Sequence, residues 1–190
     1  MLSCFQKLNH IMNILFTSSQ PYTIHLARSF KEQKWNPTYF FTKTETHNDL
    51  KKEFPDAILH DYIDAVKGIS PDSLKKIELL PIDIEMINSL SKNETIALSM
   101  LDRNDSVSDS FKHRERLDFY YDAIKYWNTI LLHFNISLVF FEEEPHQAND
   151  YILYIVSKYL SIETHMSVRT ISDLGIIPMK QFELGCEPLI

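Results

Sequence analysis

The sequence predicts an α/β protein: a Rossmann-like three-layer sandwich with a mostly parallel central sheet and a long helix before the penultimate strand. Short apolar segments typical of buried strands alternate along the chain with segments of helical periodicity. The segment at 136–141, ISLVFF, is apolar on both faces, as expected of a central parallel strand. Apolar residues in steps of three and four across 108–134 define one face of a long helix.

The first half of the chain is predicted to form a βαβ unit followed by a third strand. Residues 13–18 are typical of a short buried strand, and 21–34 of an amphipathic helix that starts at a proline. A second strand is expected at 37–42, a short polar helix at 44–56 and a third strand at 57–63. The order strand, helix, strand at the start indicates parallel pairing.

The second half is predicted to contain a helical insertion and two further strands. Two helices are expected within the insertion at about 69–106, the first starting near Pro71. The remaining elements are the long helix at 108–134, the strand at 136–141, a helix at 148–160 and a last strand at 163–169.

These elements predict one Rossmann-like domain over 12–175, in line with a length of 190 residues. Residues 1–11 are expected to be an N-terminal extension. Residues 176–190 are expected to be a C-terminal tail or the start of a missing second domain.

Composition restricts the class of partner and the compartment. The net charge of −7 and the lack of a run rich in Lys or Arg argue against nucleic acid. The two cysteines, Cys4 and Cys186, form neither a disulfide framework nor a metal motif. A reducing environment, and hence a cytoplasmic location, is the simplest expectation.

Scarce glycine excludes two kinds of phosphate site. Only Gly68, Gly175 and Gly185 occur, so neither a dinucleotide fingerprint nor a P-loop is present. Any phosphate at the first turn, TSSQPYT, must be held by side chains such as Ser18 and Ser19 and by a helix N-terminus. No metal-ligand motif such as H-E-x-x-H occurs either. We therefore predict no cofactor and no metal.

The stretch FFEEEPHQANDY at 140–151 places carboxylates and an imidazole at the end of a predicted strand. In a parallel sheet, ligands bind beyond the carboxyl ends of the strands, where strand order reverses. Glu143, Glu144 and His146 are therefore candidate catalytic residues. The three consecutive glutamates cannot all point inward, because strand side chains alternate between faces. The alternative is a solvated strand end that pairs with nearby arginines.

Other polar residues are expected near the same edge. Ser18 and Ser19 leave the first strand there, and Arg169 ends the last strand. The long helix, about 39 Å in length, should overhang the sheet. Its apolar face, extended backward, places His113 toward the cleft, with Arg114 and Arg116 on its two flanks. Arg103 leads into the same corner. Arg103, His113, Arg114, Ser18, Ser19 and Arg169 are thus candidate substrate-binding residues.

Three segments carry a resemblance to a known family: DRND at 102–105, FKHRERLDFYYDAIKYWNTIL at 111–131 and SLVFFEEEPHQANDYILYIVSKYLSIET at 137–164. The sequence resembles bacterial capsular and surface polysaccharide biosynthesis proteins, which look like glycosyltransferases with two Rossmann domains (GT-B-like). The resemblance implies an acceptor-side N-terminal half of a metal-independent enzyme that uses a nucleotide-sugar donor. It implies a nucleotide sugar or glycan acceptor as partner, and peripheral membrane contact through a lipid-linked acceptor.

Within that resemblance, position indicates the residue roles. His146 or Glu144 is the candidate general base on an acceptor hydroxyl. Arg103 or Arg114 is the candidate clamp for phosphate charge. The alternative is a non-catalytic Rossmann-like protein that binds a nucleotide or sugar, or docks on a partner or on a second copy of itself. Its interface would then be the apolar C-terminal segment LGIIPMKQFELGCEPLI.

Overall fold

The computed structural model describes residues 12–17, 21–105, 111–169 and 176–181. They form an α/β fold around a six-stranded sheet with the order β3-β2-β1-β4-β5-β6. The first five strands pair in parallel, and β6 pairs antiparallel with β5. The strands are β1 (Asn13–Phe16), β2 (Asn36–Thr42), β3 (Ile58–Asp61), β4 (Ile136–Phe141), β5 (Glu163–Arg169) and β6 (Ile176–Met179).

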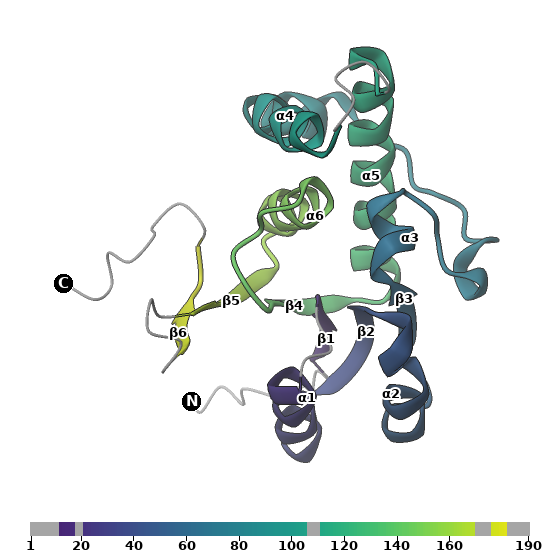
Figure 1. The fold of residues 1–190 in the computed structure, drawn as a ribbon, viewed down its shortest axis with the longest axis vertical. Helices are drawn as coiled ribbons and strands as arrows, with labels where there is room; N and C mark the ends of the chain where they lie inside the picture. The colour runs from purple at the N-terminus through teal and green to yellow at the C-terminus, as the bar shows by residue number, and fades with distance from the viewer. Residues whose placement is uncertain (1–11, 18–20, 106–110, 170–175, 182–190) are drawn as a thin grey trace, which may run out of the picture.

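Helices cover both faces of this sheet (Figure 1). Helices α1 and α2 lie on one face, and α3, α5 and α6 lie on the other. Helix α4 packs against α5 and α6, so that α6 lies between α4 and the sheet. The helices are α1 (Pro21–Glu32), α2 (His47–Glu53), α3 (Tyr62–Val66), α4 (Ile84–Asn104), α5 (His113–His133) and α6 (Ala148–Tyr159), with 3-10 turns η1 (Thr44–Thr46) and η2 (Asp72–Leu74).

Alternation along the strands divides the core into two clusters. Ile14 and Phe16 of β1 lie in the cluster that α1 and α2 cover. Leu15 of the same strand lies in the larger cluster under α3, α5 and α6, which also contains Trp127 and Tyr154. The central strand β4 supplies residues to both clusters. The predicted fold class, a mostly parallel Rossmann-like sandwich, is confirmed.

Two helix predictions need correction. The insertion at 69–106 contains one long helix, α4, and the single turn η2, in place of two helices. Helix α4 begins late because Asp83 caps it, its side chain accepting a hydrogen bond from the Met86 backbone N–H. The long helix α5 begins at His113, five residues after the predicted start at Ser108. There the Lys112 backbone N–H donates to the side chain of Glu115.

Strand β6 was missed in the sequence. Residues 176–179, expected to belong to a tail, pair antiparallel with β5 at the edge of the sheet. Pro178 weakens the sequence pattern of a strand, because a proline within a strand is tolerated only at the edge of a sheet. The long helix α5 therefore precedes the third-last strand of the described chain and not the penultimate one. The predicted N-terminal extension at 1–11 lies outside the described residues.

Candidate functional site

The sheet has a topological switch point between β1 and β4. From β1 the chain continues to β2 and β3 on one side, and then crosses to β4 and β5 on the other. Ligands of open parallel sheets bind beyond the carboxyl ends of the strands at such a point. Here the Glu142 backbone N–H donates to Thr17 Oγ1 over 3.3 Å, and the Tyr22 hydroxyl donates to the Glu142 carbonyl over 3.1 Å. The two strand exits are thus tied together.

The loop between β4 and α6 presents His146 to solvent in a defined orientation. Its Nδ1 lies 3.2 Å from the Glu144 carbonyl oxygen and 3.5 Å from Glu143 Oε1. Because a carbonyl oxygen only accepts, Nδ1 carries the hydrogen in this contact, and Nε2 of the neutral ring has the free lone pair. Arg103, at the end of α4, donates from Nη2 to the His146 carbonyl over 3.0 Å. Arg103 therefore lies beside the loop that carries Glu143, Glu144 and His146.

Asp150, in the first turn of α6, is the buried carboxyl group of this edge. Its pKa is raised to about 7, chiefly by burial; His146 acts to lower it, and the nearby Glu143 carboxylate acts to raise it. Only 9% of the residue is exposed, and its Oδ1 has no hydrogen-bond partner among the described residues. A helix N-terminus normally favours a carboxylate, so burial outweighs the helix dipole here.

Tyr62 completes the cluster from the carboxyl end of the edge strand β3. It is the first residue of α3, directly after β3, and its ring stacks on Phe41 with centroids 5.1 Å apart. Burial raises the pKa of its hydroxyl, and the carboxylates of Asp150 and Glu143 raise it further. We call Tyr62, Glu143, His146 and Asp150 the strand-end cluster. It combines a carboxyl group that titrates near neutrality with an imidazole and a phenol, which is a set suited to proton transfer.

Asp150 and Tyr62 were not predicted as site residues. An acidic residue in the first turn of a helix is ordinarily an exposed partner of the helix dipole. Asp150 lies on α6, which packs against α3, α4 and α5, and these elements are distant in sequence. The only local signal is the apolar stretch that follows in α6, YILYIV, which indicates a helix buried on several faces.

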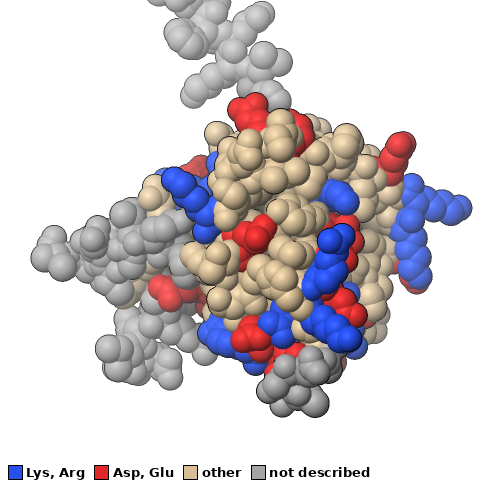
Figure 2. Space-filling model, turned by 90° about the horizontal axis from the view of Figure 1, so that it is seen from above, with Lys and Arg blue, Asp and Glu red and all other residues tan. Residues whose placement is uncertain are grey.

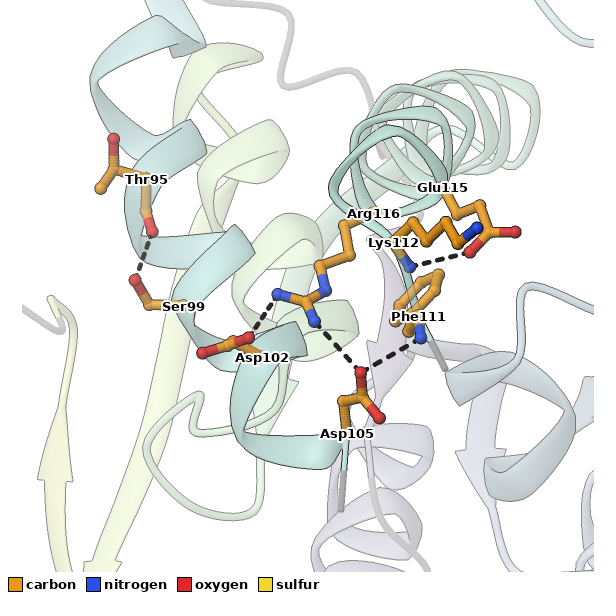
Figure 3. A network of polar contacts seen from close by, with 8 residues as sticks. All are labelled: Thr95, Ser99, Asp102, Asp105, Phe111, Lys112, Glu115 and Arg116. Carbon is orange, nitrogen blue, oxygen red and sulfur yellow. Dashed lines mark hydrogen bonds and ion pairs between the residues drawn. The ribbon is translucent and has the colours of Figure 1, made fainter. Parts of the chain in front are cut away.

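The corner between α4 and α5 differs from its prediction (Figure 3). The cation that enters it is Arg116, whose side chain is 14% exposed and pairs with Asp102 and Asp105. Its guanidinium also lies 5.8 Å from the Phe111 ring centre. Arg114 instead pairs with Asp118 on its own helix and is 84% exposed. His113 is also exposed. The structure thus assigns the corner to Arg116 and leaves His113 and Arg114 on the surface.

The error in the helix corner has a simple geometric cause. The N-terminal end of α5 does extend away from the sheet, as expected (Figure 1). However, α4 packs against α5, and Arg116 lies on the side of α5 that faces the end of α4. The corner therefore joins two helices and is a structural contact.

The remaining predicted residues cannot be placed in the site. Ser18 and Ser19 lie outside the described residues. Arg169 ends β5 at the carboxyl edge, where its backbone pairs with Ile176, but its side chain is outside the description.

The surface and composition of the described residues add three findings. Seen from above, Lys and Arg alternate with Asp and Glu without a continuous basic area (Figure 2). Within the described ranges, no group of three or more His, Cys, Asp or Glu side chains is arranged to hold a metal ion. In the same ranges, no helix combines the length and hydropathy needed to cross a membrane.

Comparison with protein-family models, with curated proteins and with solved structures gave no significant match. The site must therefore be interpreted from its own geometry.

Proposed function

We propose that this chain is the acceptor-side domain of a bacterial surface or capsular polysaccharide glycosyltransferase. The observation that carries the proposal is Asp150, a buried carboxyl group with a pKa of about 7 at the carboxyl edge of a Rossmann-like sheet. The family resemblance supports it, because the segment 137–164 that carries the resemblance also contains Glu143, His146 and Asp150.

The proposed chemistry is general base catalysis. A hydroxyl group of the acceptor glycan gives its proton to Asp150 or to Nε2 of His146. Its oxygen forms a bond to the anomeric carbon of the donor sugar, and the bond from that carbon to the nucleotide phosphate breaks. A base with a pKa near the working pH is the most effective in such a step. Arg103 holds the His146 backbone in place.

The proposal includes its partners and location. The acceptor is a glycan, lipid-linked at the cytoplasmic face of a membrane, and the donor is a nucleotide sugar bound by a second domain. No metal ion takes part in the proposed step.

A binding experiment tests this function. The isotope-labelled chain is titrated with a panel of oligosaccharides and nucleotide sugars, and amide shifts are followed by NMR. We expect saturable shifts at residues 142–147 and in the first turn of α6 with at least one oligosaccharide. The shifts should weaken in Asp150→Asn and in His146→Gln. Lys158→Gln, at the opposite end of α6, is the matched control and should bind like the parent.

Two outcomes would contradict the proposal. One is saturable glycan binding remote from the strand-end cluster. The other is binding at the cluster that is identical in Asp150→Asn, His146→Gln and the parent at every pH. The second result would favour the non-catalytic binding protein, since a base would have no role in it.

A further inference from the structure

A cavity lies between α3, α5 and the residues that follow α3. Its volume is about 360 Å³, within the range of roughly 300–1,000 Å³ typical of small-ligand pockets. Its apolar and aromatic lining includes Ile69, Leu79, Phe119 and Tyr126. None of the four residues of the strand-end cluster lines it. We call it the α3–α5 cavity.

Asn149 contributes a buried amide to the lining of this cavity. Only 5% of the residue is exposed. The indole Nε1–H of Trp127 donates to Asn149 Oδ1 over 3.0 Å, and because this nitrogen is only a donor, the contact fixes which amide atom is oxygen. The Nδ2 group is therefore a donor, and it has no hydrogen-bond partner among the described residues. A buried amide donor without a partner costs free energy, which a ligand acceptor would offset.

The neighbouring polar groups of the cavity are already paired with one another. The His60 Nε2–H donates to the Ile69 carbonyl over 2.8 Å, and the Tyr39 hydroxyl donates to His60 Nδ1 over 2.6 Å. The hydroxyl of Tyr126 then donates to that of Tyr39 over 2.8 Å. Burial lowers the pKa of His60 and favours this neutral form. These hydrogen bonds hold His60, Tyr39 and Tyr126 in place beside Ile69. The Asn149 Nδ2 group remains a buried donor without a partner among the described residues.

The lining of the cavity includes two charged side chains. Lys67 follows α3 and is exposed. Asp122 pairs with Lys125 of its own helix over 3.2 Å, which offsets its charge. The site therefore combines aromatic residues, one buried donor and a cation that is exposed to solvent.

We propose that the α3–α5 cavity binds a mononucleotide, with its flat heteroaromatic ring between the aromatic walls. A ring carbonyl or ring nitrogen accepts from Asn149 Nδ2, and the phosphate lies toward Lys67. Because Nδ2 is shielded from water in the free protein, neighbouring side chains shift slightly when the ring enters. The site is independent of the proposed glycan chemistry.

The two tryptophans allow a direct test. Trp127 lines the cavity, whereas Trp35 stacks on Phe30 in the core cluster on the opposite face of the sheet. In Trp35→Phe, Trp127 is the single tryptophan reporter. We expect uridine 5′-monophosphate to quench its fluorescence saturably, and ribose 5-phosphate to leave it unchanged.

Variants locate the binding. Asn149→Asp keeps an oxygen for Trp127 and removes the donor, and should weaken binding about ten-fold. If that variant melts early, Lys67→Gln, at an exposed position, still tests the site and should weaken binding of the monophosphate but not of uridine. Lys52→Gln on α2 is the matched control and should bind like the parent. Absence of saturable quenching by the monophosphate, or equal affinity in Asn149→Asp, Lys67→Gln and the parent, would overturn the proposal.

Discussion

At the scale of single residues, Asp150 combines burial with an unpaired oxygen. The carboxyl group lies in the first turn of a helix, a location that favours the charged form. Burial acts in the opposite direction and dominates, since it raises the pKa to about 7. Such conflicts between local preference and environment are common at functional sites, where a shifted pKa is useful for proton transfer. The two next predictions depend on this one group.

Asp150→Asn should change how stability depends on pH. The folded-state pKa of about 7 exceeds the ordinary value of 3.8, so the folded protein holds this proton more tightly. The free energy of unfolding of the parent therefore falls, through this group, as pH rises from about 4 to about 7. Asparagine at position 150 does not titrate. The free energy of unfolding of the variant should therefore rise by up to roughly 4 kcal/mol relative to that of the parent across this pH range.

Urea unfolding of both proteins at a series of pH values measures this difference. His60, whose pKa is lowered, contributes to the pH dependence of stability with the opposite sign. Below about pH 6.5 the unfolded chain binds this proton more readily, which destabilises the fold. That contribution is common to both proteins and cancels in the difference. A difference in unfolding free energy that stays flat between pH 4 and pH 7 would contradict the shifted pKa.

The two neighbours of Asp150 should move its pKa in opposite directions. Glu143→Gln removes a nearby negative charge and should lower the Asp150 pKa. His146→Gln removes an imidazole that favours the carboxylate and should raise it. The chemical shift of the Asp150 carboxyl carbon, followed by NMR in each variant, reports both changes. Shifts of the same sign in the two variants are incompatible with the proposed cluster.

Residue contacts were predictable only in part. The stretch EEEPH after an apolar strand placed Glu143, Glu144 and His146 at the carboxyl edge, and Arg103 does reach His146. The choice of Arg114 over Arg116 failed, because the direction of a helical side chain depends on which neighbouring helix covers that face. Asp150 and Tyr62 were not predicted because their burial depends on long-range packing.

At the scale of elements, one largely buried cation joins the end of α4 to the start of α5. Arg116 pairs with Asp102 and with Asp105, whose side chain is 1% exposed. Asp105 also accepts the Phe111 backbone N–H over 3.1 Å, so it joins the residues before α5 to the end of α4 (Figure 3). The corner fixes the end of α4, where Arg103 contacts the site loop.

Arg116→Ala should therefore destabilise the protein by about 3 kcal/mol, since it leaves a buried carboxylate without its cation. Arg114→Ala, two residues away, is the matched control. It removes a surface pair with Asp118 and should cost about 0.5 kcal/mol or less. Chemical unfolding of the two variants beside the parent gives the comparison. Equal stability of the two variants would refute the structural role of the corner.

The strands of the second half were predicted closely. The apolar segment 136–141 agrees with β4, and the more polar segment 163–169 agrees with β5. The region 69–106 carries helical periodicity only in its second half, and residues 75–83 form no helix or strand. Strand β6 contains Pro178 and gains its structure from pairing with β5, which no local pattern reveals.

At the scale of the whole molecule, the layers should differ in local stability. Strands β1 and β4 lie at the centre of the sheet, with helices on both faces. Helix α4 lies outside α6 and exposes Ile84 and Ile96 to solvent. Elements with fewer buried contacts open more readily than the central ones. The outer helix is therefore expected to open before the sheet.

Native-state hydrogen exchange measures this order. Amides of α4 should exchange at lower opening free energy than those of β1 and β4, while α6, which is buried on several faces, should resemble the strands. Arg116→Ala should accelerate exchange at the end of α4 without affecting β4. If α4 and β4 open with the same free energy in the parent, the molecule unfolds as one unit and the layered account fails.

The overall architecture was the most predictable level. Alternation of strands and helices, together with the long amphipathic helix, is sufficient to predict a parallel sheet with helices on both faces. Such patterns do not determine strand order. A switch point was expected because open parallel sheets generally have one, but its position between β1 and β4 was not predicted. The α3–α5 cavity was not predicted, because it depends on how α5 and residues 67–70 pack together.

The most direct test of the central claim is the titration of the Asp150 carboxyl group in the folded chain by carbon NMR. The strand-end cluster predicts a midpoint near pH 7. A midpoint near pH 4 would mean that the group is solvated and always charged at neutral pH. In that case the cluster would contain no carboxyl group poised for proton transfer, and the proposed role of this edge as a catalytic base site would be contradicted.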